Sequence, residues 1–401
     1  MITKNEKRHL ISLLFIICSL FFSAALTSCY NSGHDFPDYE GGTTAYFAYQ
    51  YPVRTLILGN DIYDNTLDNA HKCQIWSTMG GAYGGRRATV DIAVDPTLCD
   101  NLWFVDDAGN PSTQVLPMPT TYYSLLSNAI NYNGNPRGYV EVQFTDAFFN
   151  DEKAIQNTYV IPLVMTSVKG IDQILTGKTR EGLEGSSRTN TDDWEVLAKD
   201  YVLYCVKYIN PWQGKYIRRG VDNVTENGTT NTVVRKDFSL VNTDIERYKE
   251  NPVNQNDEVC GITTKNMTQA IFPVSIQRAG NKASIACNLV LTFDGNKCTI
   301  STDDDDVEST GTGEFIAKGT ERPEYKEYQW GSNNGVPVQR DILRLAYNVT
   351  FKKGKVIGWD EKKQKDILLE NDIEVTTNDT LVVQTRESNK KEFFSPKYVK
   401  N

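Results

Sequence analysis

The stretch KASIACNLVLTFDGNKCTIST, residues 282–302, decides the fold of this chain. Two runs rich in β-branched and apolar residues flank Asp294-Gly295-Asn296, and such runs are typical of strands. A short turn that contains glycine between two runs of this kind is typical of a β-hairpin. These residues therefore predict two antiparallel strands joined by a tight turn.

The rest of the second half of the chain has the same pattern. Further strand-like runs cover residues 213–222, 229–241, 269–278, 311–319, 341–359 and 380–387. None of them leads into a glycine-rich turn and a helix, which argues against a nucleotide-binding α/β fold. The second half is expected to form an antiparallel β-barrel of the lipocalin-like type, or a second sandwich.

The first half predicts an Ig-like β-sandwich. The run TAYFAYQYPVRTLIL at 44–58 is aromatic and β-branched, and shorter runs follow at 72–78, 87–95, 138–146 and 157–168. The run 201–210 reads as its final strand, and Pro211 closes it. The expected division is a signal peptide at 1–28, a tether at 29–42, a first β domain at 43–210 and a second at 211–401. The fold class is therefore all-β.

The N-terminus has the layout of an export signal. Lys4, Lys7 and Arg8 precede an apolar run from Leu10 to Leu26, and Leu26-Thr27-Ser28-Cys29 resembles the lipobox of bacterial lipoproteins. We expect cleavage before Cys29 and lipid on its thiol, which makes the membrane a partner of this chain. The expected location is the cell outer membrane, lipid-anchored and surface-exposed.

The net charge and the cysteine and histidine content exclude several classes of function. The net charge is −9, and removing the signal, which carries a net +2, leaves −11, so no basic face for nucleic acid is expected. Beyond Cys29, six cysteines permit three disulfides, or they are buried free thiols. The mature histidines are His34 and His71, which are not spaced for a metal site or a nucleophilic triad. We expect no enzyme and no cofactor.

Two aromatic segments are candidates for glycan binding, because sugar rings stack on flat aromatic faces and amides or carboxylates bind their hydroxyls. In residues 323–335 the candidates are Tyr325, Tyr328, Trp330 and Asn333, and in residues 355–366 they are Trp359 and Asp360. Packing of these rings onto the barrel is the competing interpretation. Trp76, Trp103 and Trp194 in the first domain are weaker candidates.

Two further sites are considered. Asp303, Asp305 and Glu308 lie in an acidic run that offers oxygen ligands to Ca²⁺, but the run lacks an EF-hand pattern and equally fits a solvated loop. Thr380, in Asp379-Thr380-Leu381, lies in a triplet that resembles the O-glycosylation motif of exported Bacteroidetes proteins.

Three segments together resemble a family of two-domain Bacteroidetes lipoproteins. They are Tyr-Phe-Ala-Tyr-Gln-Tyr-Pro-Val-Arg-Thr-Leu at 46–56, the strand YVIPLVMTSV at 159–168, and YINPWQG at 208–214. The resemblance covers residues 39–401 and implies an N-terminal sandwich-like domain and a C-terminal β domain, both without assigned function. It also implies association with polysaccharide-utilisation systems.

These observations lead to a non-catalytic cell-envelope lipoprotein that binds a polysaccharide or oligosaccharide or assists its capture. One alternative is a structural or adhesive surface protein whose partners are other envelope proteins, which predicts that Trp330 and Trp359 are buried. A third is a glycoside hydrolase with an unrecognised carboxylate pair, since many acidic pairs arise by chance.

Overall fold

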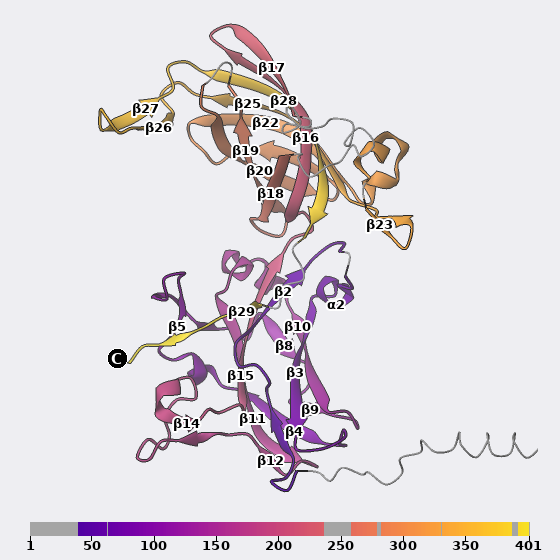
Figure 1. Cartoon of the computed structure of the whole chain (residues 1–401), viewed down its shortest axis with the longest axis vertical. Helices are drawn as coiled ribbons and strands as arrows, with labels where there is room; N and C mark the ends of the chain where they lie inside the picture. The colour runs from indigo at the N-terminus through magenta and orange to yellow at the C-terminus, as the bar shows by residue number, and fades with distance from the viewer. Residues whose placement is uncertain are drawn as a thin grey trace, which may run out of the picture.

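The computed structural model describes residues 39–61, 63–235, 258–278, 282–329, 331–386 and 392–400. Two β domains follow one another along the long axis of the molecule (Figure 1). The signal segment and Cys29 lie outside the described residues. Within the described ranges, no helix has the length and apolarity needed to cross a membrane.

The first domain is a curved sheet that forms a half-barrel. Its strands run in the order β12-β1-β3-β10-β9-β4-β11-β15-β2-β29, with β7 beside β11 and β8 beside β10. The bounds are β1 Thr44–Tyr46, β2 Pro52–Ile57, β3 Lys72–Gly80, β4 Thr89–Val94, β7 Leu116–Pro117, β8 Tyr123–Leu125, β9 Ala129–Asn131, β10 Arg137–Phe144, β11 Tyr159–Lys169, β12 Gln173–Ile174, β15 Tyr201–Ile209 and β29 Glu392–Phe393.

The main core of this domain lies between the two halves of the sheet. Alternate residues of β3 and β10, such as Ile75 and Val142, face Ile161 and Val206 of β11 and β15, and all four are almost fully buried. Alternation with period two puts one face of each strand into this core. The predicted sandwich-like first domain therefore forms by packing of these two halves.

A second layer covers the outer face of β11 and β15. It contains a small sheet of β5 Leu102–Val105, β6 Pro111–Gln114 and β30 Lys397–Tyr398. Leu102, Phe104 and Phe394 pack there against Leu203 and Cys205. Both faces of β11 and β15 are thus buried, which explains their nearly continuous apolar sequences.

The second domain is a closed antiparallel barrel of eight strands. The order is β16-β18-β19-β20-β21-β22-β25-β28, and pairing of β28 with β16 closes the ring, with β17 added beside β16. The bounds are β16 Gly214–Glu226, β17 Thr229–Arg235, β18 Glu258–Thr264, β19 Gln269–Ile276, β20 Ile285–Asp294, β21 Lys297–Ser301, β22 Val307–Ile316, β25 Ile342–Phe351 and β28 Ile373–Thr385. Of the two expected architectures, the barrel is therefore the observed one.

The hairpin predicted at residues 282–302 is present as β20 and β21. Asp294 pairs with Lys297, which leaves Gly295 and Asn296 as a two-residue loop. Gly295 has a φ of 59°, which the first position of such a loop requires and which glycine adopts without strain. Leu289, Leu291 and Phe293 point into the barrel core.

The remaining elements are short. Two small hairpins pair β13 Lys178–Thr179 with β14 Trp194–Val196 and β23 Ser332–Asn333 with β24 Val336–Pro337, and a third pairs β26 Val356–Asp360 with β27 Lys365–Leu368. The β26–β27 hairpin projects from the barrel (Figure 1). The described helices have one or two turns: α2 Thr66–Asn69, α3 Asp146–Phe149, and the 3₁₀ helices η1 Pro96–Cys99, η2 Glu152–Ile155, η3 Thr191–Asp193, η5 Gly319–Glu321 and η6 Pro323–Tyr328.

A charged network lies inside the barrel. The Arg218 Nε donates to Asp379 Oδ2 at 2.9 Å, its Nη2 donates to the Tyr347 hydroxyl at 2.9 Å, and its Nη1 donates to Glu258 Oε1 at 3.1 Å. The guanidinium also lies 5.1 Å from the centre of the Phe272 ring. Burial by itself would lower the pKa of Arg218, but Asp379, Tyr347 and Glu258 together raise that pKa above its ordinary value. The arginine therefore remains charged in the core.

The domains meet around Asn210 and the C-terminal segment. Asn210 is fully buried, and its side-chain nitrogen donates to the carbonyls of Asn266 and Gln269 in the barrel. Trp212 stacks on Phe293 inside the barrel, with ring centres 3.7 Å apart. Residues 392–400, which the sequence assigned to the second domain, lie on the first domain, where β29 pairs with β2 and β30 with β5.

Candidate functional site

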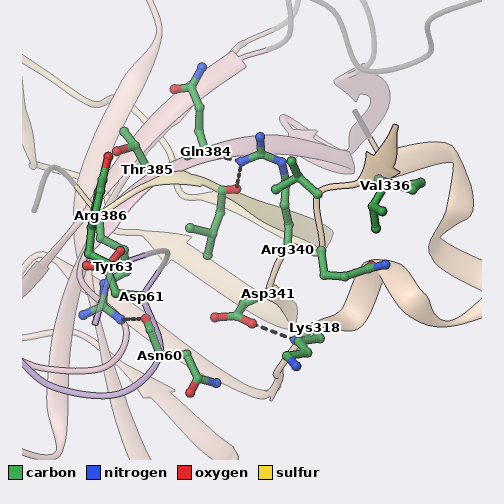
Figure 2. A pocket seen from close by; sticks show the side chains of 14 residues that line it. Asn60, Asp61, Tyr63, Lys318, Val336, Arg340, Asp341, Gln384, Thr385 and Arg386 are labelled. Atoms are coloured by element: carbon green, nitrogen blue, oxygen red, sulfur yellow. Dashed lines mark hydrogen bonds between the residues drawn. The ribbon is translucent and has the colours of Figure 1, made fainter. Parts of the chain in front are cut away.

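A cavity of about 740 Å³ opens where the two domains meet (Figure 2). Three segments line it: the chain after β2 in the first domain, the connection between β22 and β25, and the end of β28. We call it the junction pocket. Its lining residues are Asn60, Asp61, Tyr63, Lys318, Val336, Pro337, Val338, Gln339, Arg340, Asp341, Val383, Gln384, Thr385 and Arg386.

Arg386 fixes the wall that the first domain contributes. Its Nη2 donates to the carbonyls of Leu58 at 3.0 Å and Asn210 at 2.6 Å, and its Nη1 donates to the carbonyls of Asn60 and Pro211. Burial lowers the pKa of Arg386, although Tyr216, Asp61 and Asp341 act in the opposite direction. One side chain of the barrel therefore holds four backbone carbonyls at the domain junction.

The opposite wall belongs to the connection between β22 and β25. The Arg340 Nη1 donates to the carbonyls of Val383 and Gln384 at 3.1 and 3.0 Å. The backbone N–H of Lys318 donates to Asp341 Oδ1 at 2.7 Å. Burial raises the pKa of Asp341, although that hydrogen bond and the charges of Arg386 and Lys318 lower it. Figure 2 shows Arg340 and the Asp341–Lys318 pair across the pocket from Arg386.

The pocket is suited to binding a polar, uncharged or zwitterionic molecule. Three cations and two carboxylates line it together with the amides of Asn60, Gln339 and Gln384. Amides donate and accept hydrogen bonds at once, and a hydroxyl group does the same. Val336, Pro337 and Val338 add an apolar strip. Ligand sites are typically cavities of about 300–1,000 Å³ at domain interfaces, with a few polar groups that fix orientation.

Tyr325 and Tyr328 of the predicted aromatic segment 323–335 pack onto the barrel and are not among the residues that line the pocket. Tyr325 is only 7% exposed and packs against Ile316, Ile342 and Val382. Tyr328 lies half-buried with Arg219 over its ring, 5.3 Å from its centre. Their rings are 6.2 Å apart, so they anchor η6 to the barrel. Asn333 lies in β23, and Trp330 lies outside the described residues.

The second predicted segment lies apart from the pocket. Trp359 is 53% exposed on the projecting β26–β27 hairpin, whereas the adhesive alternative predicted that it is buried. The Asp360 carboxylate accepts hydrogen bonds from the backbone N–H groups of Lys362 and Lys363 at the turn. The structure therefore does not bring Trp359 and Asp360 together with Tyr325 and Tyr328.

Lysines neutralise most of the acidic run proposed for Ca²⁺. Asp303 pairs with Lys265 at 2.6 Å, Glu308 pairs with Lys352 at 3.1 Å, and Asp304 pairs with Lys355 at 2.6 Å. Asp305 contributes its backbone carbonyl to Lys352. Among the described residues, no three His, Cys, Asp or Glu side chains are grouped as metal ligands.

The remaining candidates lie in other surroundings. Thr380 is half-buried on β28, between the buried Asp379 and Leu381, and it lines a second cavity of about 740 Å³. His71 packs against Phe149 in a tilted arrangement, with ring centres 4.1 Å apart. The six cysteines within the described ranges are buried free thiols, so of the two alternatives left open the structure has the unbonded one.

The junction residues were not predicted from the sequence. Asp61 lies 280 positions before Asp341, and Arg386 lies 45 positions after it. The fold brings the three residues together at the end of β28, beside the first domain. One local signal was the charged pair Arg340-Asp341, which directly precedes the apolar strand β25. Charged residues directly before an apolar strand indicate the rim of a barrel. Nothing in the sequence indicates which rim faces the first domain.

Comparison with known proteins places these domains among proteins of unassigned function. The family model described as Domain of unknown function (DUF5627) matches residues 211–387, and a model described as an N-terminal domain matches residues 39–172. A crystal structure of a protein of unknown function from Bacteroides ovatus is 35% identical, covering 90% of this chain and 100% of that chain, with a TM-score of 0.70. No curated protein matches this chain.

Two other solved structures share much weaker similarity. One is a multidomain protein including DUF1735 from Bacteroides ovatus, at 10% identity and a TM-score of 0.36, covering 88% of this chain and 99% of that chain. The other is an auxiliary nutrient binding protein from Bacteroides thetaiotaomicron, at 10% identity and a TM-score of 0.30, covering 86% of this chain and 95% of that chain. At these scores neither bears on the function of this chain.

Proposed function

Because this chain belongs to the family of two-domain β proteins that includes the Bacteroides ovatus protein, and its second domain is a DUF5627 domain, we propose that it is a non-catalytic accessory lipoprotein that binds an oligosaccharide in its junction pocket. The matched families include no catalytic one. The pocket itself is the observation that supports this proposal.

The lining of the junction pocket fits a sugar better than an apolar molecule. Asn60 of the first domain and Gln384 of β28 both line the pocket, and both side chains are exposed. Hydroxyl groups of a sugar pair with such amides without a net charge. The Tyr63 side chain, 49% exposed, offers a flat ring at the rim on which a sugar face stacks.

The pocket residues supply binding groups and no Ser–His or Cys–His pair. The lining contains no histidine, cysteine or serine, and Asp61 and Asp341 are its two carboxylic acids. Nucleophilic catalysis needs an activated nucleophile beside a general base. This composition lacks a Ser–His or Cys–His pair, whereas Asp61 and Asp341 are the carboxylic acids that the glycoside hydrolase alternative would use.

Membrane attachment through Cys29 belongs to the same proposal. The basic start, the apolar run and the residues Thr27 and Ser28 before Cys29 are the sequence features that support it. Lipid on Cys29 would hold the protein at the outer membrane, facing outward, where glycans arrive.

Calorimetric titration of the purified soluble chain with a panel of oligosaccharides tests the binding proposal. The double variant Asn60→Ala/Gln384→Ala removes two amides that each contribute about 0.5–1.5 kcal/mol, so binding is expected to weaken about tenfold. Asn288→Ala, which removes an exposed amide elsewhere on the barrel, is the matched control and should bind as the unmodified chain does. Absence of heat with every oligosaccharide, or equal affinity of the double variant and the control, would refute the proposal.

A further inference from the structure

Two large aromatic side chains lie exposed and in contact on the outer face of the first domain. Trp76 of β3 is directly opposite Tyr139 of β10 in the antiparallel register. Their ring centres are 4.6 Å apart, and they are 49% and 43% exposed. Side chains of this size are normally buried, and exposed aromatic pairs are typical of binding surfaces. We call this pair and the polar side chains around it the aromatic face.

Strand alternation explains why these rings point outward. On β3, Cys73, Ile75 and Ser77 face the core and are almost fully buried. Trp76 lies between Ile75 and Ser77 and therefore points to the other side. On β10, Val140 occupies the core beside Tyr139 in the same way. The core thus fixes the position of both rings.

Amide side chains surround the aromatic pair. A hollow of about 350 Å³ is lined by Trp76 and Tyr139 together with Asn131, Asn133 and Asn135, next to Arg137. Asn131 is paired with Tyr139 across the sheet. Its Oδ1 accepts a hydrogen bond from the Thr89 hydroxyl at 2.9 Å, which leaves the amide nitrogen to donate. Rings flanked by amides suit a ligand with both apolar faces and hydroxyl groups, and sugars have both.

The turn that carries these amides is held rigidly. Tyr132 is fully buried, and its hydroxyl lies 2.8 Å from the Ser77 hydroxyl and donates to the carbonyl of Thr78 at 3.1 Å. The N–H of Asn135 donates to the carbonyl of Tyr132, and the N–H of Gly134 to that of Arg86. Since the turn is ordered before a ligand arrives, binding costs less conformational entropy.

The charged residue that lines the hollow indicates the class of ligand. Arg137 is the one ionisable group other than tyrosine among the residues that line the hollow, and no carboxylate lines it. Its exposed side chain forms no hydrogen bond or ion pair with the described part of the chain. A guanidinium binds a carboxylate in a bidentate manner. Uronic acid units carry such a carboxylate on a ring that also stacks on aromatic side chains.

We propose that the aromatic face binds an acidic, uronate-containing polysaccharide, with sugar rings on Trp76 and Tyr139 and a carboxylate on Arg137. This site is on the first domain, away from the junction pocket, and involves different residues. It therefore goes beyond the proposed function, and either site can fail without the other.

Affinity electrophoresis of the soluble chain in gels that contain polygalacturonate, alginate or neutral dextran tests this site. We expect retardation by a uronate polymer, at least a tenfold loss of affinity in Trp76→Ala/Tyr139→Ala, and none in Trp359→Ala, which removes an exposed tryptophan of the second domain. Arg137→Gln should weaken uronate binding at least fivefold, and added salt should weaken it further. Arg344→Gln, an exposed arginine of β25, is the control for charge.

The following results would refute the aromatic face or its acidic ligand and do not bear on the junction pocket. Equal retardation of the unmodified chain and Trp76→Ala/Tyr139→Ala refutes the aromatic face, as does the absence of retardation by both uronate polymers. Retardation by dextran that equals retardation by the uronates, or an unchanged Arg137→Gln variant, refutes the acidic ligand. The junction variant Asn60→Ala/Gln384→Ala should behave as the unmodified chain does in these gels, so the two sites are separated.

Discussion

Replacing Arg386 with methionine should destabilise the chain by about 3 kcal/mol. Its guanidinium serves four carbonyl groups at the domain junction, and the bonds to Leu58 and Asn210 are buried. A buried acceptor without a donor costs about 1–3 kcal/mol, so these two cost about 2–6 kcal/mol. The bonds to the carbonyls of Asn60 and Pro211 are only partly buried, so water replaces the guanidinium there.

Two terms place the expected value in the lower half of that range. Methionine retains much of the apolar stem of arginine, so little packing is lost. Burial lowers the pKa of Arg386, which means that its charge is unfavourable in the buried position. Replacing Arg386 with methionine removes that charge and its cost. The remaining loss of free energy weakens the contact between the domains. The barrel and the first domain of the variant should therefore unfold in separate transitions.

Guanidinium denaturation followed by tryptophan fluorescence, together with calorimetry, measures this effect. The control is Arg344→Met, which removes an exposed arginine from the same barrel and should change the free energy of unfolding by less than about 0.5 kcal/mol. If Arg386→Met loses less than about 1 kcal/mol, or loses no more than the control, the role assigned to the four carbonyl bonds is wrong.

Four further predictions concern other parts of the chain. Arg218→Met should cost about 3–5 kcal/mol in denaturation because Asp379 stays buried without the guanidinium, and Arg218→Met/Asp379→Leu should recover most of that loss; equal costs would contradict it. Burial raises the pKa of the six described thiols to about 12, so an exposed-thiol reagent at pH 8 should label none until the chain unfolds. Because unfolded thiols lose their protons near pH 9.0 while folded ones keep them, stability should fall as pH rises above 9, and a flat pH profile would oppose this assignment. Cys29→Ala should abolish incorporation of labelled fatty acid in a bacterial host, and unchanged labelling would exclude Cys29 as the anchor.

Local features of the sequence predicted the architecture well. Gly295 in a two-residue loop and the alternation of β20 were visible in residues 282–302, because hairpin formation depends on neighbouring residues. The family resemblance of residues 46–56, 159–168 and 208–214 is confirmed by the 35% identical Bacteroides ovatus protein.

The choice of binding residues was harder to predict, because burial is a property of the whole fold. Tyr325 and Trp76 are both aromatic residues near polar neighbours, yet the first is 7% exposed and the second 49%. For Trp76, the alternation of Cys73, Ile75 and Ser77 was a usable signal that the ring points outward. For Tyr325, in a short 3₁₀ helix, no such period exists, so the sequence could not show its burial.

The pairing of residues 392–398 with the first domain affects how the chain folds during its synthesis. Phe394 packs against Phe104 and Tyr51, with ring centres 5.0 and 5.4 Å apart, and it is synthesised after every strand of the barrel. Until it emerges, the apolar layer around Phe104 remains uncovered, although every strand of the half-barrel except β29 has already been made. A chain that stops directly after the barrel would thus display an open apolar site on its first domain, which chaperones and proteases recognise in unfinished proteins.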